Sequence, residues 1–154
     1  MLEIALAFVL IFYIFYSLYR HVSDSYLQND PMILDLHTTL KTFLSRDKKW
    51  NNPLEQLNTR NVMNEISIYK GYKSYTINKE KIYLCLLDEN GSYYNKNMLI
   101  FVLLHEIAHV LSNSVGHTQE FHDIFEALIA QATDDGVYDP KLTIDPNYCG
   151  YNVK

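Results

Sequence analysis

Two histidines and a glutamate in the middle of the chain have the types and spacing of a metal site. His105 and His109 stand four residues apart, with Glu106 directly after the first. On a helix this spacing places both imidazoles on one face, where both can reach a Zn²⁺ ion at roughly 2.0–2.1 Å. The carboxylate of Glu106 then lies close enough to take a proton from a metal-bound water, whose pKa zinc lowers toward about 7. The H-E-x-x-H pattern therefore predicts a zinc-dependent hydrolase with Glu106 as its general base.

The residues around this pattern favour a metal over two surface histidines. All seven residues of the segment 98–104, just before His105, are apolar. Burial of two histidines and a carboxylate on such a helix is costly unless a partner satisfies them. Zinc satisfies the imidazoles, whereas surface histidines would belong on an amphipathic helix.

A hydrolytic zinc site needs a third protein ligand and an open position for water. His117 is the preferred candidate because it follows Gly116, where the chain can turn back toward the first helix, and precedes the next predicted helix. Glu126 on that second helix is the runner-up. Glu120 and His122, also on the second helix, are further candidates, and His122 can equally be a solvent-facing residue.

The patterns of apolar residues outside this segment predict a single α+β domain. Helical periodicity marks three segments, and runs rich in β-forming residues mark three more. The helix that carries the two histidines is expected to be capped by Asn95 or Asn97, and the following helix by Thr118. The predicted elements are a helix with apolar positions 33, 36, 40, 43 and 44, a strand over 62–69, a hairpin of strands 74–77 and 81–87, and helices over 98–112 and 119–133.

The N-terminal segment predicts a membrane anchor. Residues 2–19 are almost all apolar, with one charge at Glu3, and 18 helical residues at about 1.5 Å each nearly span the ~30 Å hydrocarbon core. No Lys or Arg precedes Arg20 and no A-x-A pattern follows, which argues against a cleaved signal peptide. We expect a transmembrane anchor over 1–20, a polar linker over 21–31 and one catalytic domain over 32–154.

The charge and the cysteine content limit which compartment and which partners are expected for the protein. The net charge of −5 and the absence of a Lys/Arg stripe give no support to nucleic-acid binding. Arg20 and His21 flank the C-terminal side of the apolar segment, so the positive-inside rule predicts a single-pass protein with its domain in the cytoplasm or the interior of a virion. Cys85 and Cys149 are too few for a disulfide framework. We expect both thiols to be free, which favours a reducing compartment.

The segment HEIAHVLSNSVGHTQEFHDIFEAL resembles the zincin-like metallopeptidases of the SprT and WLM group. The shared features are H-E-x-x-H, a short spacer, a Gly-His that opens a helix, and an acidic-Phe pair after it. The resemblance implies His105, His109 and His117 as zinc ligands, Glu106 as the base, and a minimal zincin fold with a small antiparallel or mixed sheet packed on the two helices. It also implies that strand 81–87 lies at the edge of the sheet, where it would pair with an extended peptide. With the anchor, the chain looks like the small membrane-bound versions encoded by large DNA viruses.

The expected function is thus a membrane-anchored zinc metallopeptidase that acts on a protein or peptide substrate and contacts the bilayer through residues 2–19. One alternative is a structural membrane or virion protein that keeps zinc without turnover. Another is an amidase or deaminase that acts on a small molecule in a closed pocket. The alternatives differ in the role of Glu106 and in the shape of the site.

Overall fold

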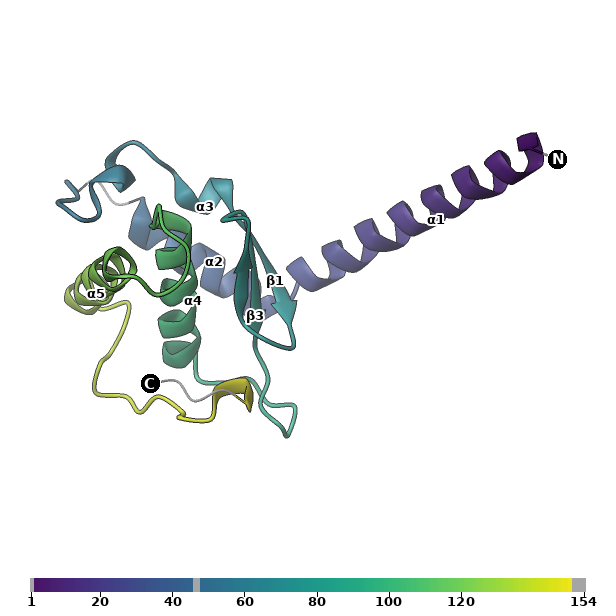
Figure 1. The fold of residues 1–154 in the computed structure, drawn as a ribbon. Coiled ribbons are helices and arrows are strands. Elements are labelled where there is room, and N and C mark those ends of the chain that lie inside the picture. The colour runs from purple at the N-terminus through teal and green to yellow at the C-terminus, as the bar shows by residue number, and fades with distance from the viewer. Residues whose placement is uncertain (1, 46–47, 151–154) are drawn as a thin grey trace.

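The computed structural model describes residues 2–45 and 48–150. Within them the protein is α+β, with a small mixed sheet, a long N-terminal helix that projects from the domain, and helices packed on the sheet (Figure 1). The elements are α1 (Leu2–Gln28), α2 (Pro31–Leu44), the 3-10 helix η1 (Glu55–Asn58), α3 (Val62–Glu65), β1 (Ser67–Gly71), β2 (Tyr75–Ile77), β3 (Lys81–Cys85), α4 (Lys96–Leu111), α5 (Gln119–Asp134) and the 3-10 helix η2 (Tyr148–Gly150).

Helix α1 is long and apolar enough to cross a membrane, by length and composition. Its side chains are exposed over residues 3–22, and no residue of its most apolar stretch is buried. The segment 21–31 that we predicted to be a linker is helical as far as Gln28, because the end of α1 continues onto β1 and packs there. Asp30 then caps α2 by accepting a hydrogen bond from the backbone N–H of Met32 at 2.9 Å.

The sheet has the order β1-β3-β2, with β3 parallel to β1 and antiparallel to β2. The hairpin of β2 and β3 confirms the sequence prediction. The expectation that the strand over 81–87 lies at the edge is wrong, since β3 is the central strand. β3 pairs with β1 on one side and with β2 on the other, and its residues Ile82 and Leu84 are completely buried. The edge strand beside α4 is β2.

The strand predicted over 62–69 is also displaced. The chain first forms the short helix α3, and β1 begins only at Ser67. Val62 and Met63 are both buried although they are consecutive, which a half-exposed strand does not allow and a helical turn against α2 does. Alternation of the side chains between two faces starts after this turn.

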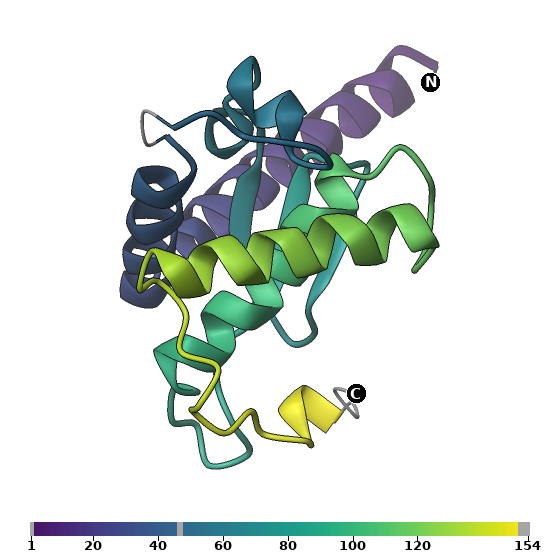
Figure 2. The same cartoon turned by 90° about the vertical axis from the view of Figure 1, so that its left-hand side faces the viewer.

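Helices α4 and α5 form as predicted and carry the core. Helix α4 lies between the sheet and α5, and α5 crosses it (Figures 1 and 2). Asn95 caps α4 by accepting from the N–H of Asn97 at 2.8 Å, and Thr118 caps α5 by accepting from that of Phe121 at 3.4 Å. The predicted apolar positions of α2 are all buried against this layer.

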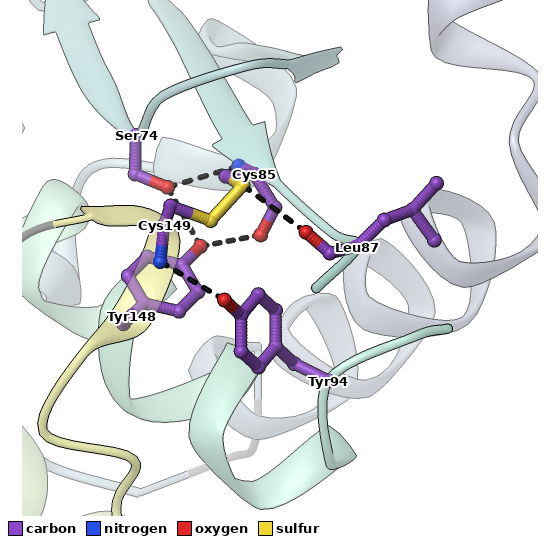
Figure 3. Close-up of a disulfide and its surroundings, with 6 residues drawn as sticks. All are labelled: Ser74, Cys85, Leu87, Tyr94, Tyr148 and Cys149. Atoms are coloured by element: carbon purple, nitrogen blue, oxygen red, sulfur yellow. Dashed lines mark hydrogen bonds between the residues drawn. A yellow bond between two sulfur atoms is a disulfide. The ribbon is translucent and has the colours of Figure 1, made fainter. Parts of the chain in front are cut away.

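The prediction of two free thiols is wrong, because Cys85 and Cys149 form a disulfide (Figure 3). The irregular segment after α5 returns to the end of β3, which the separation of the two cysteines in sequence does not reveal. The hydroxyl of Tyr148 donates to the carbonyl oxygen of Cys85 at 2.5 Å and lies 2.7 Å from Ser74 Oγ, and the N–H of Cys149 donates to Tyr94 Oη at 3.0 Å. The expected reducing compartment therefore loses its support, since disulfides persist in oxidising surroundings.

Candidate metal centre

Three imidazoles converge where α4 meets the loop that leads to α5. His117 Nε2 lies 3.1 Å from His105 Nε2 and 3.2 Å from His109 Nε2, and the three ligand atoms all lie within 4.8 Å of one another. Ligand atoms at ~2.0–2.1 Å from a tetrahedral zinc ion are separated by about 3.3–3.4 Å. The spacing of the three nitrogens therefore fits a single metal ion.

The positions of these histidines follow from the local sequence. His105 and His109 are one turn apart on α4, as their spacing predicts. Helix α4 ends at Leu111, and the loop 112–118 turns back over it to present His117. Gly116 has φ of +84°, a left-handed conformation that glycine adopts without strain.

A buried phenylalanine forms the floor of the cluster. Phe121 is fully buried, and its ring centroid lies 4.3 Å from that of His109, 4.8 Å from that of His117 and 4.9 Å from that of His105. Contact with all three rings limits their rotation and keeps water from their inner side. In the sequence, the signal for this role is the acidic-Phe pair formed by Glu120 and Phe121.

The carboxylate of Glu106 lies where α4 meets β2 of the sheet. Glu106 is only 6% exposed, and its Oε2 accepts a hydrogen bond from Thr76 Oγ1 at 2.6 Å. Burial raises the pKa of Glu106, and the bond from Thr76 acts in the other direction. A carboxyl group whose pKa is raised by burial is suited to accept and return a proton.

Thr76 was missed in the sequence, although a signal for it exists. It stands on β2 between two exposed residues and pairs with the fully buried Ile82 of β3. Residues paired in this way lie on the same face of the sheet. A polar side chain at such an inward position indicates a buried polar partner, which here is Glu106.

The electrostatic surroundings keep two of the imidazoles neutral. Burial, followed by the charges of the neighbouring histidines, lowers the pKa of His105 to about 4. Burial, followed by His117 and Lys79, lowers the pKa of His109 to about 4. The neutral imidazole is the form that binds a metal ion.

These shifts predict that the metal-free protein loses stability as the pH falls from 6.5 toward 4. In that range the unfolded chain takes up protons on His105 and His109, whose ordinary pKa is 6.5, while the folded chain does not. Urea unfolding at a series of pH values, with chelator present, measures the effect. His105→Phe should weaken the pH dependence, and an equal dependence in this variant would contradict the explanation.

The other candidate ligands lie outside the cluster. Glu126 is exposed on α5, and the ring of the exposed His122 is 6.4 Å from that of His117. The carboxylate of Glu120 is directed away from the histidines and binds the loop residues Asn113 and Ser114. Of the candidates for the third position, the structure thus brings His117 to the pair on α4.

Comparison with known proteins finds viral relatives. Over 105 residues the chain is 49% identical to an uncharacterized protein of Invertebrate iridescent virus 6. The matched region covers 66% of this chain and 59% of that protein. It is 47% identical over 98 residues to an uncharacterized protein of Invertebrate iridescent virus 3, with 63% and 62% covered. It is 32% identical over 130 residues to an uncharacterized protein of Acanthamoeba polyphaga mimivirus, with 79% and 65% covered.

The chain therefore spans about three fifths of the length of these relatives. No family model matches it, and no solved structure matches it. These relatives are viral proteins, and their names give no activity.

Proposed function

We propose that this chain is a membrane-anchored zinc metallopeptidase of the zincin type. The observation that carries the proposal is the convergence of three imidazole nitrogens, two of them on the helix that also carries the buried Glu106. His105, His109 and His117 would hold the ion, and zinc bound there would act as a Lewis acid toward water and a carbonyl oxygen. The resemblance to SprT and WLM metallopeptidases supports the same assignment.

Glu106 supplies the proton transfer in this proposal. Thr76 binds its Oε2 and fixes the plane of the carboxylate, which leaves the other oxygen to take a proton from the attacking water. The raised pKa helps Glu106 to hold that proton and then deliver it to the leaving amine. The bond that is broken joins the carbonyl carbon to the amide nitrogen of the peptide, and the oxygen of the attacking water becomes bound to that carbon.

An extended peptide is the substrate class that the surroundings of the site favour. His117 is exposed, so the cluster opens on the surface rather than into a closed cavity. The edge strand β2 runs beside α4, with Tyr75 and Ile77 exposed at 44% and 40%. An edge strand offers backbone groups with which an extended peptide can pair. The proposed peptide site is therefore along β2 and not along β3.

Metal removal tests this function. The purified full chain in detergent, supplied with zinc, is expected to cleave members of a peptide library. Treatment with a chelator should stop cleavage, and added zinc should restore it. Cleavage that continues without metal would contradict the proposal.

We also propose that α1 anchors the domain in a viral membrane as a single span. Arg20 and His21 favour a domain on the cytoplasmic side or inside a virion, and the disulfide favours surroundings less reducing than the cytosol. The interior of a particle that has left the cell satisfies both. Protection of the domain from added protease in intact particles is the expected result, and digestion without detergent would contradict this orientation.

A further inference from the structure

The loop that presents His117 is held by a side chain rather than by regular structure. Its seven residues, 112–118, lie between the end of α4 and the start of α5. The N–H of Ser112 still donates to the carbonyl oxygen of Ala108, as the last bond of α4. The next two backbone N–H groups, those of Asn113 and Ser114, both donate to the carboxylate of Glu120.

Glu120 accepts five hydrogen bonds from this loop. Its Oε1 accepts from Asn113 N at 3.0 Å and from Asn113 Nδ2 at 2.8 Å. Its Oε2 accepts from Ser114 N at 3.1 Å, Ser114 Oγ at 2.7 Å and Ser112 Oγ at 3.1 Å. Hydrogen bonds to an ionised carboxylate are stronger than neutral ones. The bonds also lower the pKa of Glu120 to about 2, so the carboxylate is charged throughout the working pH range.

The same network reaches the far end of the loop. Ser114 Oγ, which bonds to Glu120, also lies 2.6 Å from Thr118 Oγ1, the cap of α5. His117 directly precedes Thr118, so the network fixes the backbone on both sides of the turn that carries the imidazole. Glu120 stands in the first turn of α5, where the helix dipole also favours a negative charge.

We propose that Glu120 is a positioning residue that pre-organises the loop and sets the metal affinity of the site through His117; this inference rests on the proposed metal site. Without the carboxylate, the loop residues regain backbone freedom, and metal binding would have to restrict it again. Loss of a partner that orients a ligand typically weakens metal binding by about 10- to 100-fold. We expect a loss of that size when Glu120 is neutralised.

The experiment uses the full chain in detergent and compares Glu120→Gln with wild type and with Glu89→Gln, the same change at an exposed residue outside the site. Gln keeps the size of the side chain, but its NH₂ group is itself a donor and would face the N–H and O–H donors of the loop. Zinc affinity is measured by competition with a chromophoric chelator, and Co²⁺ absorption reports the geometry of the ligands. Hydrogen exchange of the loop 112–118 in the metal-free protein reports its order.

In Glu120→Gln we expect zinc binding about 10- to 100-fold weaker, an altered Co²⁺ spectrum and faster exchange in the loop. The metal-free protein should still fold, with a lower melting temperature because the bonds to the charged carboxylate are lost. Glu89→Gln should behave as wild type. If Glu120→Gln does not fold, Ser114→Ala, which removes one of the five bonds and the link to Thr118, should show a smaller loss in the same direction.

The possible failures are distinct. Unchanged zinc affinity and spectrum in Glu120→Gln, with metal bound by wild type, would overturn the positioning role and leave the proposed metal site intact. A wild type that binds neither zinc nor cobalt would overturn the metal site, and the positioning role with it. Weaker binding without faster loop exchange would also overturn the mechanism proposed here, because it would point to the charge of Glu120 instead of the loop.

Discussion

Glu106→Gln is expected to reduce peptide cleavage by at least about 10²–10⁴-fold, the usual contribution of a general base, without loss of bound metal. Gln has nearly the same volume, and its amide oxygen can still accept the hydrogen bond from Thr76. It cannot take a proton from water at neutral pH. Since the three histidines are unchanged, metal content measured by mass spectrometry should equal that of wild type. Turnover is measured on the peptide that wild type cleaves best.

Thr76→Val is the matched comparison for Glu106→Gln. It leaves the carboxylate in place but removes its hydrogen bond, so a partial loss of kcat with unchanged metal content is expected. Full activity in Glu106→Gln would show that another group is the base. If wild type binds zinc but cleaves no member of a broad peptide library, the structural role in a membrane or virion gains over the peptidase.

Local patterns in the sequence were sufficient for the elements that carry the site. The caps Asn95 and Thr118, the apolar segment before His105 and the helical spacing of the two α4 histidines all act over a few residues, and α4 and α5 form as predicted. The hairpin of β2 and β3 is likewise a local structure. Its turn residues and flanking β-formers determine it without reference to the rest of the chain.

The features that the sequence did not reveal depend on contacts between distant segments. Strand β3 is central because β1 pairs with the side of β3 that β2 leaves open. The packing of α1 and α2 on β1 holds it there. The disulfide requires the tail after α5 to return to the end of β3. Thr76 meets Glu106 only once β2 lies beside α4.

The second large effect expected is the loss of metal from His117→Ala. Removal of one of three ligands should weaken zinc binding by more than the roughly 10- to 100-fold that loss of an orienting partner costs. His117 is exposed, so the fold should tolerate the substitution, with a change in unfolding free energy of about 0.5 kcal/mol or less. Zinc bound to the purified full chain, wild type against variant, is the measurement.

Glu126→Ala separates this ligand set from its rival. Glu126 is exposed on α5 and outside the cluster, so its removal should leave the metal content at the wild-type level. A zinc site with two histidines and a glutamate would give the reverse pattern, with metal lost from Glu126→Ala and kept in His117→Ala. That result would require the loop 112–118 to move away from α4 when the metal binds. It would also break the contact of His117 with the ring of Phe121, which the present geometry holds at 4.8 Å between ring centroids.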